Sequence, residues 1–293
     1  MPYITTRDGT DLYVKEWGSG RPVILMHGWP LNADSWDVQA MALAEAGFRT
    51  IAYDRRGFGR SDQPWNGYDY DTLADDLADV MEETEADDDA AIIGFSMGGG
   101  EVARFTSKQG RGRVSAAVFA SSVVPKVAQS DDWPDGVPQA KLDQITAQMQ
   151  EDRAGFLQTF LKQFYGWGVL ARPVSEGVLD AGFQQGMMSG ARPFYAAAAA
   201  WAGTDFRPDL PALEDVPTLI LHGTSDANVP IEGTGRKLAE ALPHATLIEY
   251  DGSPHGIFET DKERFARDVV GFLTQDDRGT ASDTSGSAIP LTS

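Results

Sequence analysis

The 293-residue sequence contains no cysteine. Disulfides, thiolate catalysis, cysteine-ligated zinc and iron–sulfur clusters are therefore excluded, so covalent catalysis must use oxygen or nitrogen. Histidine is also scarce: there are 4, without an H-E-x-x-H spacing, and we expect no metal site. No apolar run approaches the roughly 20 residues that span a bilayer, and the N-terminus lacks the basic and apolar regions of a signal peptide. We expect a cytoplasmic protein with no membrane partner.

Basic side chains are also few relative to acidic ones. The chain has 44 acidic and 24 basic side chains, which gives a formal net charge of −20. Its summed field repels nucleic acid and anionic lipid, so neither is an expected partner. The acidic surface has two interpretations, ordinary solubility or adaptation of a halophilic protein to high salt, and the sequence leaves both open.

Short apolar runs alternate with helical patterns along most of the chain. The runs are continuous, which is typical of strands that helices cover on both faces. The βαβα order predicts an α/β protein with a doubly wound, mostly parallel sheet of about eight strands. The expected strands are 21–28, 48–54, 89–95, 113–121, 216–223 and 244–251. The expected helices are 33–46, 70–86, 97–108, 232–242 and 261–274.

One interval breaks this order. From 125 to 210 the sequence shows proline-marked boundaries, helical and alanine-rich stretches and no strand pattern. We therefore expect an inserted helical cap over 125–210 on a core made of 1–124 and 211–275. The last segment, 276–293, has too few apolar residues to offset the entropy of ordering, and we expect a disordered tail there.

The stretch "IIGFSMGGG" places Ser96 in a G-x-S-x-G motif between an expected strand and an expected helix. In that context the serine sits on a sharp turn at the carboxyl edge of the sheet, and the glycines at 94 and 98 leave room for the tight approach of the backbone. A serine hydroxyl is a weak nucleophile without an adjacent base, so the motif predicts catalysis only if a histidine and a carboxylate join it.

Both partners occur after later strands. "LILHGTSDANVP" places Asp226 after one expected strand, and "LIEYDGSPHGIF" places His255 after the next. The chain order of Ser96, Asp226 and His255 is nucleophile, acid and base, in which the histidine takes the serine proton and the aspartate fixes its tautomer. Asp251 is a rival carboxylate, but its position close to His255 in the sequence favours an exposed turn.

The other histidines have plainer interpretations. His27 and His222 each lie in a strand-end "HG", where we expect structural imidazoles, and His244 lies in a polar turn. The oxyanion of an acyl-transfer intermediate needs two donors, and we expect the N–H groups of Met97 and Trp29 to supply them. Pro30 restricts the backbone at Trp29. It either makes the loop rigid and nothing more, or it orients the Trp29 carbonyl toward an incoming hydroperoxide.

The stretches "HGWP", "DRRGFGRSDQPWNGYDYDTLADDL", "GFSMGGGEVAR" and "DGSPHG" together resemble the cofactor-free bacterial haloperoxidase, aryl esterase and perhydrolase branch of the α/β-hydrolase superfamily. The resemblance covers about 1–275 and implies the α/β-hydrolase fold, the triad and oxyanion donors named above, and no cofactor. "GTSDANVP" departs from the family pattern beside the acid. We expect Pro30, Phe95, Val229, Ile257 and Trp201 to line the substrate pocket.

The resemblance implies hydrolysis of small carboxylic esters through an acyl-enzyme, with hydrogen peroxide able to replace water. The peracid so formed would oxidise halide. The expected partners are a small-molecule ester or acid and water or hydrogen peroxide, with homo-oligomerisation left open. Two alternatives remain: an amide or γ-lactam hydrolase on the same triad, and a non-catalytic protein that binds a small ligand. Epoxide hydrolase or dehalogenase chemistry is disfavoured because those relatives carry aspartate where this chain has Ser96.

Overall fold

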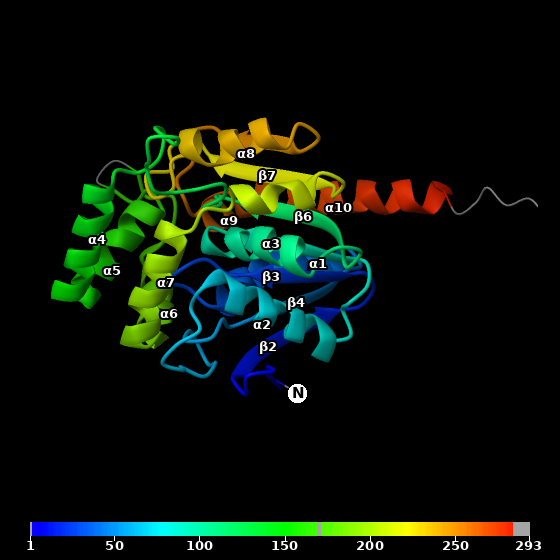
Figure 1. Ribbon diagram of the computed structural model, residues 1–293, viewed down its shortest axis with the longest axis horizontal. Helices are drawn as coiled ribbons and strands as arrows, with labels where there is room; N and C mark the ends of the chain where they lie inside the picture. The colour runs from blue at the N-terminus through cyan, green and yellow to red at the C-terminus, as the bar shows by residue number, and fades with distance from the viewer. Residues whose placement is uncertain (1, 169–170, 284–293) are drawn as a thin grey trace, which may run out of the picture.

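An eight-stranded sheet forms the centre of the molecule (Figure 1), as the computed structural model shows for residues 2–168 and 171–283. The strands are β1 (Tyr3–Thr5), β2 (Asp11–Gly18), β3 (Pro22–Met26), β4 (Arg49–Tyr53), β5 (Ala90–Phe95), β6 (Val114–Ala120), β7 (Thr218–Gly223) and β8 (Thr246–Tyr250). Their order is β1-β2-β4-β3-β5-β6-β7-β8, and every neighbouring pair from β4 onward is parallel. This confirms the doubly wound, mostly parallel sheet. The antiparallel strands β1 and β2 lie outside the six strand segments that the sequence located.

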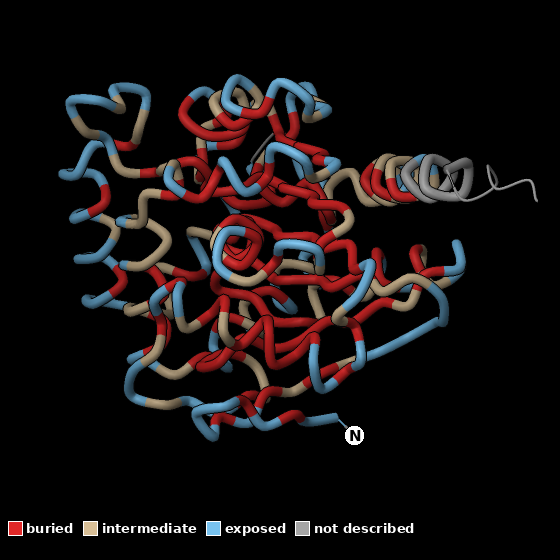
Figure 2. Tube along the Cα trace, turned by 45° about the vertical axis from the view of Figure 1, so that its right-hand side comes forward, coloured by how far each residue is buried: buried red, intermediate tan, exposed pale blue. Residues whose placement is uncertain are grey.

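Helices cover both faces of the sheet, and the strands alternate their apolar side chains between two clusters. Ile24 and Met26 of β3 pack in one cluster with α2 (Tyr70–Glu83) and α3 (Met97–Lys108). Val23 and Leu25 pack in the other with α1 (Asp37–Glu45) and α10 (Lys262–Asp283). Figure 2 shows this buried interior as the red centre of the trace. Double-sided burial explains why the strands are continuously apolar.

A group of helices separates β6 from β7. Among the described residues this interval holds four α-helices and no strand of the sheet. They are α4 (Gln139–Glu151), α5 (Arg153–Phe164), α6 (Glu176–Met188) and α7 (Ala191–Gly203). Figure 1 shows them together at the end of the sheet to which the β7 arrow points. The cap therefore lies over the carboxyl edge of the parallel strands.

The C-terminal boundary differs from the expectation. Helix α10 continues beyond Gln275 to Asp283, so 276–283 is helical where a disordered tail was expected. Leu273 is a buried residue of this helix, and main-chain hydrogen bonds can propagate a helix beyond such an anchor. The rest of the expected tail, 284–293, lies outside the described residues. The remaining elements are the short helices α8 (Gly235–Ala241), α9 (Ile257–Thr260), η1 (Ala33–Trp36), η2 (Arg207–Leu213) and η3 (Ile231–Gly233).

Candidate active site

Ser96 lies on the tight turn between β5 and α3, with φ of 54° and ψ of −115°. Positive φ is uncommon for a residue with a side chain and stores local strain. The Ser96 N–H donates to the carbonyl of Ala120 at 2.8 Å, which ties the turn to the neighbouring strand. A Cβ on Gly94 would collide with the carbonyl oxygen of Gly98, and one on Gly98 with that of Met26. Only glycine fits at both positions, so the G-x-S-x-G spacing has a steric cause.

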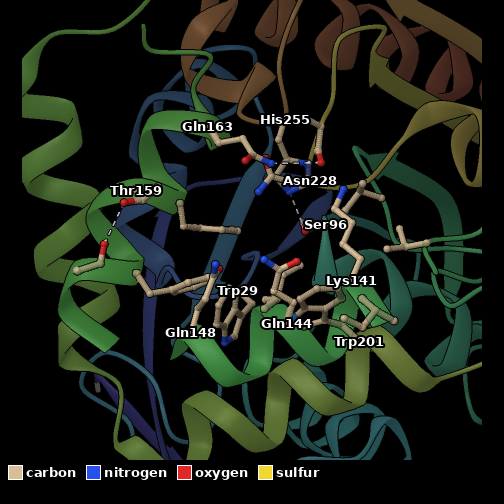
Figure 3. Close-up of a pocket in the computed structure, with 18 of the residues that line it drawn as sticks. Trp29, Ser96, Lys141, Gln144, Gln148, Thr159, Gln163, Trp201, Asn228 and His255 are labelled. Carbon is tan, nitrogen blue, oxygen red and sulfur yellow. Dashed lines mark hydrogen bonds between the residues drawn. The ribbon is translucent and has the colours of Figure 1, made fainter. Parts of the chain in front are cut away.

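The structure brings Ser96, His255 and Asp226 into one hydrogen-bonded chain. Figure 3 shows the part of it between Ser96 and His255. His255 Nε2 lies 2.9 Å from Ser96 Oγ, and His255 Nδ1 lies 2.6 Å from Asp226 Oδ2. All three side chains are buried. The three loops that carry them follow β5, β7 and β8, whose carboxyl ends meet at the same edge. This arrangement lets the imidazole accept the serine proton while the carboxylate holds its other nitrogen.

Asp226 is held from two sides. Its Oδ1 accepts the N–H groups of Asn228 at 2.9 Å and Val229 at 2.8 Å. Its Oδ2 faces His255 and, at 3.3 Å, Nε2 of His222. Burial alone would raise the pKa of Asp226, but the nearby His255 and the hydrogen bonds from His222 and His255 outweigh it and hold that pKa below its ordinary value. The carboxylate is thus ionised beside the imidazole.

The rival groups lie elsewhere. Asp251 is exposed, and its carboxylate accepts from Thr224 Oγ1 at 3.4 Å. His27 is buried against Arg55, and burial with that positive charge holds the pKa of His27 well below its ordinary value, as fits a structural imidazole. His244 is exposed and contacts the carbonyl of Val216. His222 is a buried imidazole bonded to the carbonyl of Val229, and it also contacts the Asp226 carboxylate, which the sequence did not predict.

The two expected oxyanion donors are adjacent to the serine turn. Met97 begins α3, so its N–H has no acceptor within the helix. Among the hydrogen bonds of the described residues, the Trp29 N–H likewise donates to no main-chain acceptor. Trp29 shares the cavity wall with Ser96, and its indole Nε1 donates to the carbonyl of Phe194 in α7 at 3.0 Å. That bond joins the loop after β3 to α7 of the cap.

A cavity of about 480 Å³ opens above Ser96 and His255. Its apolar wall comes from Trp29 and from cap residues that include Phe156, Phe160 and Trp201. Its polar lining includes Lys141, Gln144 and Gln148 of α4, Gln163 of α5 and Asn228 after β7, which Figure 3 labels around the catalytic groups. The cavity thus combines an apolar wall with several polar side chains, as small-molecule sites do.

The pocket expectations are partly wrong. Val229 and Trp201 line the cavity, but Pro30, Phe95 and Ile257 do not. Phe95 packs behind the His255 ring, with the ring centroids 5.0 Å apart. Ile257 is fully buried at the start of α9. Pro30 is buried under the cap, where a Cβ on Gly186 of α6 would lie 3.4 Å from its Cγ.

The reason for these errors is that neighbours in sequence point to opposite sides of a turn or strand. The sequence also missed the lining residues on α4 and α5, because their orientation depends on how the cap docks. Their helical spacing, with Lys141, Gln144 and Gln148 three and four residues apart, was the available signal. Among the described residues, no cluster of three or more histidine and acidic side chains could hold a metal ion. In that same part of the chain, no helix has the length and apolar character to cross a bilayer.

Comparison with known proteins identifies the fold family. The family described as the alpha/beta hydrolase fold matches residues 21–262, most of the chain. The chain belongs to the α/β-hydrolase family.

This α/β-hydrolase is 42% identical over 277 residues to the non-heme chloroperoxidase CPO-A1 of Kitasatospora aureofaciens, covering 94% of this chain and 100% of the relative. It is 41% identical over 276 residues to the bifunctional esterase/perhydrolase DCH of Acinetobacter calcoaceticus, covering 93% and 99%. A crystal structure of bromoperoxidase from Bacillus anthracis matches with a TM-score of 0.88 and 39% identity, covering 93% of this chain and 99% of that one. The expected place in the cofactor-free haloperoxidase branch is confirmed.

Proposed function

We propose that this α/β-hydrolase cleaves small carboxylic esters through an acyl-enzyme on Ser96 and transfers the acyl group to water or hydrogen peroxide. The observation that carries the proposal is the hydrogen-bonded chain from Ser96 Oγ through His255 to Asp226, which opens into the cavity. Relatives named esterase/perhydrolase and chloroperoxidase, at about two fifths identity, support both acceptors.

The reaction proceeds in two acyl transfers. Ser96 Oγ attacks the ester carbonyl as His255 Nε2 takes its proton, and the N–H groups of Trp29 and Met97 stabilise the oxyanion. His255 then gives the proton to the leaving alcohol, and the acyl group stays on Ser96. Water or hydrogen peroxide next gives a proton to His255 and attacks the acyl carbonyl. Ser96 recovers its proton, and a carboxylic acid or a peracid leaves.

The apolar wall of the cavity supports small acyl or aryl groups. Trp29, Phe156, Phe160 and Trp201 form this wall over the nucleophile, and a site of about 480 Å³ is of the size that small-molecule ligands use. A free peracid formed there would oxidise halide outside the site. That step needs no group from the protein.

The test compares wild type with Ser96→Ala on a short p-nitrophenyl ester and on acetate with hydrogen peroxide. We expect the variant to lose at least about 1,000-fold in both esterase rate and peracid formation, because only oxyanion stabilisation and binding remain. Unchanged thermal unfolding serves as the folding control. Near wild-type turnover by the variant would refute the mechanism. A γ-lactam turned over faster than any ester would instead favour the amidase alternative, and inertness to a fluorophosphonate probe would favour the non-catalytic one.

A further inference from the structure

His222 is a fully buried side chain at the end of β7, four residues before Asp226, and the proposed chemistry leaves it without a role. Its Nε2 lies 2.9 Å from the carbonyl oxygen of Val229 and 3.3 Å from Asp226 Oδ2. A carbonyl oxygen can only accept, so Nε2 carries the proton. One N–H therefore faces both the Val229 carbonyl and the catalytic carboxylate.

The surroundings of the ring hold the imidazole in this orientation. Nδ1 is buried and has no hydrogen-bond partner among the described residues. It lies against Gly235 of α8, where an added Cβ would come within 2.7 Å. A flipped ring would place a carbon toward Asp226 and lose the bond to Val229. A buried polar atom without a partner, here Nδ1, costs free energy. The same ring orientation points the Nε2–H donor at Asp226.

The geometry points to His222 as a positioning residue that holds Asp226 Oδ2 in line with Nδ1 of His255. With the N–H groups of Asn228 and Val229 on Oδ1, it completes a set of donors on both carboxylate oxygens. This role rests on the proposed function, because it acts through the triad.

The charged groups near His222 lie on β8, on α8 and in the loop after β7. Glu249 of β8 is its neighbour in register, and that carboxylate is bound by Arg236 of α8 at 2.8 and 2.9 Å. Within the described part of the chain, the titratable group in contact with His222 is Asp226, which in turn contacts His255. Removing the His222 donor thus acts first on the carboxylate. The ionised Asp226 carboxylate has then lost a stabilising hydrogen bond, so its affinity for a proton rises and the acid limb of the proposed reaction moves to higher pH.

The test uses His222→Leu, which removes the donor, and His222→Gln, whose amide Nε2 can donate from a similar position. The measured quantity is the second-order rate at which a fluorophosphonate labels Ser96, followed from pH 4 to 9, together with kcat and KM for the ester. For His222→Leu we expect a fall of about 10-fold in labelling rate and in kcat, an unchanged KM, and an acid limb moved to higher pH. His222→Gln should restore the rate to within about 3-fold of wild type and return the acid limb.

Two further variants separate positioning from stability. Leu219→Ala removes a buried side chain from the same strand without touching Asp226 and should lower the melting temperature with the acid limb unmoved. Gly235→Ala keeps His222 but displaces its ring, so it should move the acid limb to higher pH, as His222→Leu does. It therefore tests the proposal even if His222→Leu folds poorly.

The proposal is overturned if the fluorophosphonate labels His222→Gln as slowly as His222→Leu. It is also overturned if Gly235→Ala and His222→Leu lower the labelling rate without moving the acid limb. Labelling reports the triad without any choice of substrate. A wild type that labels at Ser96 but turns over no ester therefore contradicts the proposed function and leaves this test intact.

Discussion

Replacing Asp226 with asparagine should disable the proposed base through its tautomer. Oδ1 of Asp226 accepts two main-chain N–H groups, at 2.9 and 2.8 Å. An amide must therefore keep its oxygen on that side, because the reverse orientation leaves two buried donors unpaired at about 1–3 kcal/mol each. Its NH₂ group then faces Nδ1 of His255 and donates to it. The imidazole proton is forced onto Nε2, where it points at Ser96 Oγ.

A histidine protonated at Nε2 cannot accept the serine proton, so Asp226→Asn should lower kcat for a p-nitrophenyl ester about 10,000-fold. This corresponds to about 5.5 kcal/mol of transition-state stabilisation. KM should change little, since the cavity wall is untouched. Stopped-flow or plate-based release of p-nitrophenol measures both constants.

Asp251→Asn is the matched control for this substitution. It changes the same functional group in the exposed turn before His255, where the carboxylate contacts only Thr224 among the hydrogen bonds of the described residues. We expect wild-type kcat. A loss below about 10-fold in Asp226→Asn, or an equal loss in Asp251→Asn, would refute the assignment of the acid.

Three other predictions follow from charge. Lys141 is the one Lys or Arg among the described residues that line the cavity. Lys141→Gln should therefore lower kcat/KM about 5-fold for a negatively charged hemisuccinate ester and leave kcat/KM for an uncharged ester unchanged. Equal effects on both esters would contradict this. Glu101→Gln should reduce the free energy of unfolding in urea by about 3–5 kcal/mol, because it leaves the buried Arg55 guanidinium uncompensated, and a smaller loss would show that water reaches the pair. At a net charge of −20, the melting temperature should rise from low to molar KCl; no rise would remove the salt-adaptation hypothesis.

The sequence sufficed for the triad because each member follows a recognisable strand. Parallel strands end at one edge of the sheet, so a correct strand assignment already placed Ser96, Asp226 and His255 at that common edge. The six continuous apolar runs were recognisable for the same reason. Strands β1 and β2 are short or half exposed and lie at the antiparallel edge, where that signal fades.

The remaining parts of the site depend on contacts between distant segments. Phe156 and Phe160 line the cavity because α5 docks against Trp29, and an apolar stripe alone does not say what it packs against. His222 looked like a core histidine because its sequence neighbours are apolar, and its contact to Asp226 depends on the bend of the loop after β7. Pro30 was assigned to the pocket from its place beside Trp29, but α6 covers it.

The most direct test of the central claim is to trap the acyl-enzyme. Protein quenched in acid during turnover of p-nitrophenyl acetate is digested, and the site of acetylation is mapped by mass spectrometry. We predict one acetyl group on Ser96, lost on incubation with water or, more rapidly, with hydrogen peroxide, and absent from Ser96→Ala. An acetyl group on any other residue, or full turnover without acetylated Ser96, would contradict the account.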